Sequence, residues 1–234
     1  LMSKQTDLLN LTDGITTDSN GNVGIGTSSP TQKLNVNGRF QIDAGWEIKL
    51  ENAAQNGFAT IQNAGAGTNT DLGFSTAGSE RMRIDSAGRV TMPYQPAFHV
   101  LKGSNQTIPT GTQNTKITMA TVVVDQGGNF STGTSRYTVP VSGKYYVAIN
   151  IGYYGGGTTY ARDVVSSIRV NNVATLSLNN QIVNLVNGND HASHTVSGIL
   201  SLSANDYLEA FINYADHTGV SVTANSVFYG HLIG

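Results

Sequence analysis

Short runs in which apolar and polar residues alternate, separated by turn residues, account for most of this chain. Alternation with a period of two predicts β-strands that bury one face, and no segment shows the longer period of an amphipathic helix. Asn171-Asn172, between two such runs, predicts a hairpin turn. About eight to ten strands fit into residues 96–234, a spacing typical of a β-sandwich or jelly roll. The runs in this part are TKITMATVVVD, RYTVPV, KYYVAINIGYY, VVSSIRV, VATLSL, SHTVSGILSL, DYLEAFINY, GVSVTA and SVFYGHLIG.

The apolar content changes near Pro93 and Pro96 and divides the chain into two parts. Large apolar side chains make up roughly a quarter of residues 1–95 and roughly a third of residues 96–234. The second part can therefore build a core of its own, whereas the first buries too little to offset the entropy of ordering its backbone. We expect residues 1–95 to form a slender shaft or collar of short strands, and residues 96–234 to form a globular head.

A short internal repeat supports the interpretation of the first part as turns and short strands. Residues 18–25 read DSNGNVGI and residues 85–92 read DSAGRVTM, so each copy predicts a tight D-S-x-G turn followed by a short strand. Two copies do not make a solenoid. Short strands with little apolar surface become stable when several chains share one core, because neighbouring chains also cover the strand edges. This part of the chain therefore predicts an intertwined trimer.

Four segments of the second part carry a family resemblance. They are PAF at 96–98, DQGGNF at 125–130 with RYTVPVSGKYY at 136–146, SLSANDYL at 201–208, and SVFYGHLIG at 226–234. In this order they resemble the opening strand, the turn with its proline, glycine and tyrosine signature, the late strand and the closing strand of the complement component one q family and its tumour-necrosis-factor-like relatives. Asn205 stands where glycine is usual, and the family's cysteine near the central proline is absent. The resemblance implies a jelly-roll β-sandwich over nearly the whole of residues 96–234.

Two segments of the first part resemble a different group of proteins. DSNGNVGIGTSSPTQKLNVNG and GSERMRIDSAGRVTM are similar to segments that recur in bacteriophage tail fibres. Together the two resemblances imply an all-β, homotrimeric tail-fibre tip, located extracellularly on the virion, that attaches it to a bacterial surface glycan or outer-membrane protein. The N-terminal part would then contact other phage tail proteins. Two alternatives stay open, a structural virion or surface-fibre protein without receptor binding and a polysaccharide depolymerase.

Charge and cysteine content narrow the classes of partner. The formal net charge is −2, charged residues make up 12% of the chain, and there is no cysteine. The sequence therefore lacks the basic field that holds a nucleic-acid backbone, and it can form neither a disulfide nor a thiolate metal site. No apolar run approaches the roughly 20 residues that span a bilayer. We expect no nucleic acid partner and no membrane insertion.

The glycine-rich segments do not predict nucleotide binding. Residues 155–157 are three glycines, but no helix pattern follows them, as a dinucleotide fingerprint requires. Thr134 occupies the lysine position of a P-loop-like segment that starts at Gly128. No Ser-His-Asp set, and no pair of carboxylates across a cleft, can be singled out. We therefore expect a protein that is not an enzyme and needs no cofactor.

The first segment with the composition of a binding loop surrounds the three glycines. It contains Tyr153, Tyr154, Tyr160 and Arg162. Tyrosine supplies amphipathic contact area at low entropic cost, and arginine can anchor an anionic sugar or phosphate. These four residues are candidates for receptor contact. The alternative is that Tyr153 and Tyr154 end a strand and pack at the trimer interface.

The second such segment, NGNDHASH, offers Asp190, His191 and His194. As exposed polar residues of a loop, they are further candidates for receptor contact. The spacing of the two histidines also leaves open a metal site in a loop, with Asp216 and His217 as a second pair. The single, scattered acidic residues argue against a dense site, and we expect no bound metal.

Overall fold

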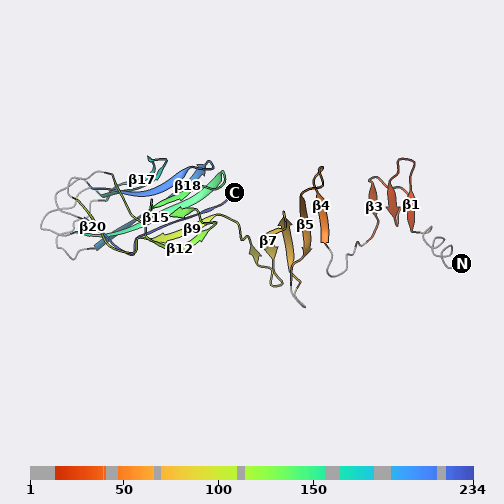
Figure 1. Ribbon diagram of the computed structural model, residues 1–234, viewed down its shortest axis with the longest axis horizontal. Helices are drawn as coiled ribbons and strands as arrows, with labels where there is room; N and C mark the ends of the chain where they lie inside the picture. The colour runs from red at the N-terminus through yellow and green to blue at the C-terminus, as the bar shows by residue number, and fades with distance from the viewer. Residues whose placement is uncertain are drawn as a thin grey trace. The chain divides into compact units, whose positions relative to one another are not determined.

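All the regular secondary structure that the structure describes is β (Figure 1). The structure is a computed structural model, and the residues it describes are 14–38, 40, 47–65, 70–109, 114–155, 164–181, 191–214 and 220–234. The chain divides into two compact units, Leu1–Thr91 and Met92–Gly234. No helix in the described ranges is long and apolar enough to cross a membrane.

The first unit contains two small sheets. In the three-stranded sheet the order is β1-β2-β3, with β1 and β2 antiparallel and β2 and β3 parallel. The five-stranded sheet is an antiparallel meander in which each strand pairs with the next along the chain. The strands are β1 Ile15–Thr17, β2 Val23–Ile25, β3 Leu34–Val36, β4 Glu47–Glu51, β5 Phe58–Asn63, β6 Leu72–Thr76, β7 Ser79–Ile84 and β8 Val90–Thr91.

The two D-S-x-G segments fold into the same turn, as the repeat predicts. The carboxylate Oδ1 of Asp18 accepts hydrogen bonds from the backbone N–H groups of Asn20 and Asn22, both at 2.9 Å. Asp85 Oδ1 does the same for residues 87 and 89, at 3.0 and 2.9 Å. The glycine of each turn has a positive φ, which glycine adopts without a steric penalty. These backbone hydrogen bonds also lower the pKa of both aspartates.

Among its described residues, the first unit has polar contacts between its strands and no buried apolar core. Arg83 bridges Asp71 at 2.8 Å and Glu80 at 2.6 Å. The hydrophobic side chains of the buried core all lie between Phe98 and Phe228, in the second unit. Large apolar side chains of the first unit are exposed instead; they include Leu34, Leu50 and Val90 on its strands and Phe40 outside them. Within the described residues, the surface that would normally be buried on folding therefore remains in contact with solvent.

The second unit, called the head below, is a sandwich of two sheets. The β15 sheet has the order β10-β20-β15-β21-β9-β12, and β18 also pairs with β15. The β19 sheet has the order β13-β14-β19-β16-β17, and β11 also pairs with β19. The strands are β9 Ala97–Leu101, β10 Gln106–Ile108, β11 Thr115–Lys116, β12 Thr121–Gln126, β13 Phe130–Ser131, β14 Arg136–Thr138, β15 Gly143–Gly155, β16 Val164–Val170, β17 Val173–Gln181, β18 His191–Leu202, β19 Tyr207–Tyr214, β20 Val220–Val222 and β21 Val227–Leu232.

Aromatic rings from both sheets meet in the core of the head. The ring of Phe98 stacks on Tyr137 of the β19 sheet with centroids 4.1 Å apart, and it meets Phe228 edge-on at 4.9 Å. All three side chains are buried. Burying a side chain of this size stabilises the fold by about 1.5–3 kcal/mol. The core is therefore built by residues that lie more than a hundred positions apart in the sequence.

One sequence prediction is confirmed in the strand connections and one is wrong. Asn171 and Asn172 have φ values of 50° and 67° and join β16 to β17, as the hairpin prediction requires. Asn205 has a φ of 73°, which explains why glycine is usual at this position. The segment TKITMATVVVD is not one long strand, because β11 and β12 belong to different sheets. Ile117 and Met119, buried between them, carry the chain from one sheet to the other.

Candidate functional site

The first candidate segment ends the long strand β15, on which successive side chains alternate between core and surface. Tyr153 points into the sandwich and is 0% exposed. Tyr154 lies on the outer side, where its hydroxyl accepts a hydrogen bond from the side-chain amide of Asn105 at 3.3 Å. Only Tyr154 of this pair can therefore offer its ring to a partner without a change in the strand.

The second candidate segment forms the start of β18, which is a strand and not a loop. His191 is exposed, and its ring lies 5.5 Å from that of Tyr154 on the neighbouring strand. His194 is 6% exposed and lies inside the sandwich. Residues three apart on a strand face opposite sides. The two histidines therefore do not converge on a metal ion, and the described residues contain no group of three or more His, Cys, Asp or Glu side chains that could hold one.

Tyr153 and His194 are thus corrected from receptor contacts to core residues, because the strand alternation turns both inward. Their aromatic and imidazole rings are 5.3 Å apart. Tyr160, Arg162 and Asp190, together with Asp216 and His217, lie outside the described residues. Of the predicted contacts whose placement is described, the structure brings Tyr154 and His191 together on the outer surface.

His194 joins the two sheets of the head through a buried polar cluster. The hydroxyl of Tyr153 lies 3.3 Å from His194 Nδ1, and Ser166 Oγ makes a short hydrogen bond with Nε2. Ser166 is in β16 of the β19 sheet and is fully buried. Both ring nitrogens are satisfied by hydroxyl groups, which suits a neutral imidazole. Burial lowers the pKa of His194 and raises that of Tyr153 to about 12.

We expect the head to lose stability as the pH falls below about 6.5, the ordinary pKa of histidine. Because the pKa of His194 is lower in the folded state than in the unfolded state, the unfolded chain binds the extra proton first. The free energy of unfolding should fall between pH 6.5 and the lowered pKa, by up to about 1.4 kcal/mol per pH unit. Urea unfolding at fixed protein concentration between pH 5 and 7.5 measures this slope.

Replacing His194 with glutamine should flatten that slope, because the buried titrating group is gone. The matched control is His191→Gln, which removes an exposed histidine from the same strand and should keep the slope of the parent protein. Equal slopes in the parent protein and His194→Gln would show that another group controls the acid sensitivity.

A polar hollow of about 460 Å³, called the Gly152 groove below, lies beside Tyr154 and His191. It forms where β15 changes partners, from β21 up to Asn150 to β20 from Tyr153 onward. At this junction the carbonyl of Gly152 accepts a hydrogen bond from the N–H of Thr223 at 2.8 Å. A Cβ on Gly152 would lie 2.6 Å from Thr223 Oγ1, so a larger residue here would displace the Thr223 side chain. The groove is lined by Gly152, Tyr153, His191, Ala192, Ser193, Thr223 and Asn225.

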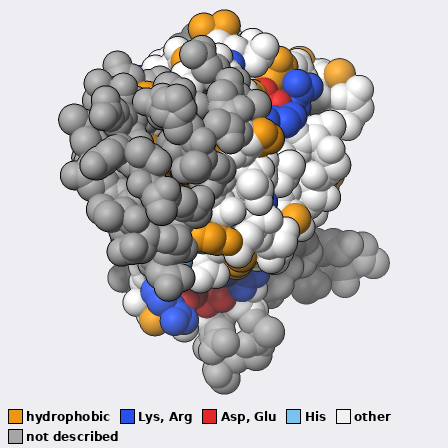
Figure 2. Space-filling model, turned by 90° about the vertical axis from the view of Figure 1, so that its left-hand side faces the viewer, with side chains coloured by type: hydrophobic (Ala, Val, Ile, Leu, Met, Phe, Trp, Pro, Cys, Tyr) orange, Lys and Arg blue, Asp and Glu red, His pale blue; other side chains and the backbone are white. Residues whose placement is uncertain are grey.

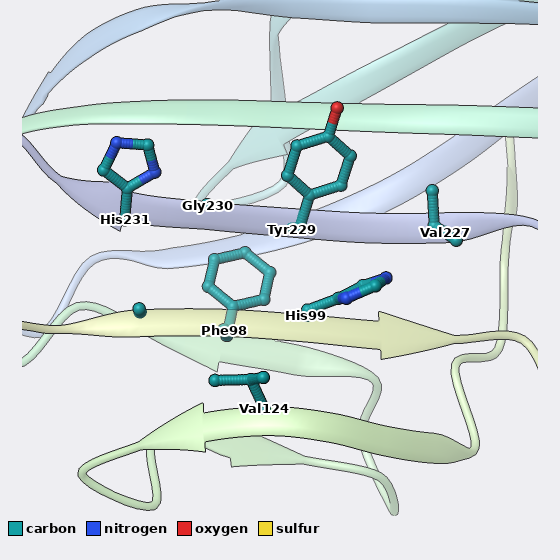
Figure 3. Close-up of a pocket in the computed structure, with 8 residues that line it drawn as sticks. Phe98, His99, Val124, Val227, Tyr229, Gly230 and His231 are labelled. Atoms are coloured by element: carbon teal, nitrogen blue, oxygen red, sulfur yellow. The ribbon is translucent and has the colours of Figure 1, made fainter.

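A second, larger hollow of about 660 Å³ lies on the outer face of the same sheet. Three adjacent strands contribute to it: Val227, Tyr229 and His231 come from β21, His99 from β9 and Val124 from β12 (Figure 3). Tyr229 and His99 meet at 5.9 Å between ring centroids. The strip of side chains continues onto β15 and β18, where Tyr146 and the 63% exposed Ile199 lie opposite each other. We call this surface the aromatic face.

The outer face of the β19 sheet carries charged side chains, unlike the aromatic face. Glu209 is 2% exposed and accepts hydrogen bonds from Lys116 at 3.0 Å and Arg136 at 2.8 Å. The guanidinium of Arg136 lies 4.0 Å from the centre of the Tyr207 ring, and that of Arg169 lies 4.1 Å from the Phe211 ring. Charged groups therefore cover the aromatic rings on this side, whereas no cation–π contact between described residues covers the rings of the aromatic face.

The residues of the aromatic face are ones that the sequence analysis did not single out. The alternation in SVFYGHLIG already places Tyr229 and His231 on one side of a strand, and that in AFHVL isolates His99. A search for histidine and tyrosine at alternate strand positions would have found them. Only the pairing of β9 with β21 brings them together.

The sequence of the head matches a known class of domain. Residues 97–233 match the family model of the C1q domain, which covers more than half of the chain. The chain therefore belongs to the C1q domain family. C1q domains are generally non-enzymatic recognition domains and commonly form trimers, and no catalytic family is indicated. The predicted jelly-roll head is confirmed by this match.

One solved structure illustrates the likeness. The globular domain of zebrafish complement 1qA protein is 22% identical to this chain, with a TM-score of 0.43; the alignment covers 60% of this chain and 98% of that one. No curated protein matches the chain.

Proposed function

We propose that the protein is the homotrimeric, non-catalytic tip of a bacteriophage tail fibre and that its head binds a receptor on the bacterial surface. The observation that carries the proposal is the combination of a recognition-type head with a strand-rich N-terminal unit in which the described residues form no buried apolar core. Such a unit cannot offset the entropy of ordering its own chain. Three copies that share their exposed apolar side chains would bury them, as a fibre shaft does.

The composition of the aromatic face supports a contact with a second copy of the chain. The face is an uncharged strip of tyrosine, histidine and aliphatic side chains, of which Val124 is 44% exposed, whereas the β19 sheet turns its ion pairs outward. Interface cores are depleted in charged residues and enriched in aromatic ones. In the proposed trimer the aromatic faces therefore meet, and the β19 sheets remain in solvent.

Receptor contact is proposed at the end of the head that carries β20 and the Gly152 groove. Figure 2 views the molecule from this side, and the described side chains that line the Gly152 groove there include Ser193, Thr223 and Asn225. Small polar residues with a few tyrosines are typical of adaptable binding surfaces. Several weak sites on one trimer, and several fibres on one virion, would add up to firm attachment because each further contact is effectively intramolecular.

Binding to cells tests this function directly. We expect fluorescently labelled, purified protein to bind a susceptible bacterial strain and to reduce phage adsorption when it is added first. A protein that assembles into virions but binds no host strain would instead support a structural fibre protein without receptor binding. Turbid haloes around protein spotted on a host lawn would support a polysaccharide depolymerase.

A further inference from the structure

The Gly152 groove has the size and chemistry of a small-ligand site. Its volume of about 460 Å³ lies within the roughly 300–1,000 Å³ typical of such sites. Two strands and a turn fix its walls, since Gly152 N–H and Ser226 Oγ are hydrogen-bonded at 3.1 Å and Ser226 is fully buried. The groove is therefore part of the rigid sandwich.

The polar groups in the groove suit a ligand rich in hydroxyl groups. Asn225 offers an amide, Ser193 and Thr223 offer hydroxyls, and His191 offers an imidazole. These side chains both donate and accept hydrogen bonds, as sugar hydroxyls also do. Next to them, the ring of Tyr154 lies against His191 and provides an amphipathic aromatic edge for the less polar side of a sugar ring.

The absence of charge among the residues that line the groove decides between classes of sugar. No described lining residue is Lys, Arg, Asp or Glu. Recognition of a carboxylate or phosphate calls for arginine or lysine, because charge-assisted hydrogen bonds compensate for the desolvation of the anion. The groove has few of the apolar side chains that a lipid tail or a hydrophobic peptide anchor would need.

We infer that the Gly152 groove binds a neutral saccharide. The inference rests on the proposed receptor-binding function, since it assigns that function to one site and one class of ligand. It replaces the earlier expectation of contact through Tyr153 and His194, which lie in the core, with contact through Ser193, Asn225 and the outer pair Tyr154 and His191.

Saturation-transfer NMR and calorimetry on the 234-residue chain test the inference. The probes are the neutral disaccharides lactose, maltose, cellobiose and chitobiose, with sialyllactose as the acidic comparison. We expect at least one neutral probe to bind with a dissociation constant of about a millimolar, the affinity of sites that act through avidity. Asn225→Ala and Ser193→Trp should each weaken that binding at least tenfold, the first by removing an amide and the second by filling the groove.

Thr175→Trp is the matched control, because Thr175 is an exposed hydroxyl residue of β17 in the other sheet. It should bind the sugar as the parent protein does. The inference is overturned if no neutral probe binds, if only sialyllactose binds, or if both groove variants bind as tightly as the parent while keeping its mass and thermal stability. Asn225→Ala keeps the test decisive should Ser193→Trp fail to fold.

Cell binding by the same variants separates this inference from the proposed function. If the parent protein and both groove variants bind host cells equally well, the groove is not the receptor site, although the head still binds a receptor. If the parent protein binds no host cell, the proposed function fails, while the NMR result still decides whether the groove takes a neutral sugar. Binding to cells stripped of surface polysaccharide would indicate a protein receptor and count against the inference.

Discussion

Tyr229→Lys should shift the mass of the proposed trimer, three times 24.7 kDa, towards the 24.7 kDa of one chain, because it removes the contact between heads that supports the weaker contacts of the shaft. Tyr229 stands in the middle of the aromatic face, between His99 and Tyr146, with ring centroids 5.9 and 6.4 Å away. Three lysines brought together at this face would each lose hydration, and like charges placed together across an interface cost several kcal/mol. Light scattering at micromolar concentration measures the mass. Val124→Lys, at the edge of the same face, should act in the same direction.

Val173→Lys provides the control for this charge. Val173 is an apolar residue of β17 and is 67% exposed. The same substitution at this position therefore places the lysine on the β19 sheet instead of the aromatic face. This variant should keep the mass of the trimer. A parent protein that is already monomeric at micromolar concentration would contradict the proposed assembly. A Tyr229→Lys variant that keeps the mass of the parent protein would show that the shaft, or a surface other than the aromatic face, holds the trimer.

Gly230→Val should destabilise the head by about 3 kcal/mol or more, at the upper end of the cost of overfilling a packed core. A Cβ at this position would lie 2.8 Å from the carbonyl oxygen of Tyr146 and 2.9 Å from the ring of Phe98. The backbone oxygen belongs to a paired strand and cannot move away without breaking the pairing of β15 with β21. Such a loss is a large share of the roughly 5–15 kcal/mol by which domains are stable.

Gly133→Val is the matched substitution in open space. A Cβ on Gly133 would meet nothing closer than Ser131 Oγ at 3.9 Å, so the change should alter the free energy of unfolding by less than about 0.5 kcal/mol. Gly230→Ala should fall between the two. Thermal and urea unfolding of the three variants measure the order of their stabilities. A Gly230→Val protein as stable as the parent would contradict the close packing at this strand.

Local structure was largely predictable because it depends on residues that are close in sequence. The D-S-x-G turns follow from one aspartate that reaches the amides two and four residues later, and the hairpin at Asn171 follows from the tolerance of asparagine for a positive φ. The recurrent alternation predicted strands without helices. The four C1q-like segments extended the prediction from single strands to the jelly-roll architecture of the head.

The candidate site was less predictable, because alternation shows that a strand has two faces but not which face is buried. Tyr153 and Tyr154 are equivalent in the sequence, yet one is in the core and the other on the surface. His194 was predicted as a loop residue, although β18 begins three residues earlier and turns it inward. Composition alone could not separate a binding loop from the end of a polar strand.

The sequence by itself thus determined the β class, the turns, the two-part organisation of the apolar content and the C1q-like signatures. The tertiary structure alone decided which residues make up the two surfaces to which a function is proposed. The aromatic face unites His99 with Tyr229, and the Gly152 groove unites Ser193 with Asn225. These partners lie 130 and 32 residues apart in the sequence, and strand pairing brings them together. Such pairing is a property of the whole sandwich, since each strand's register is fixed by the core that all of them share.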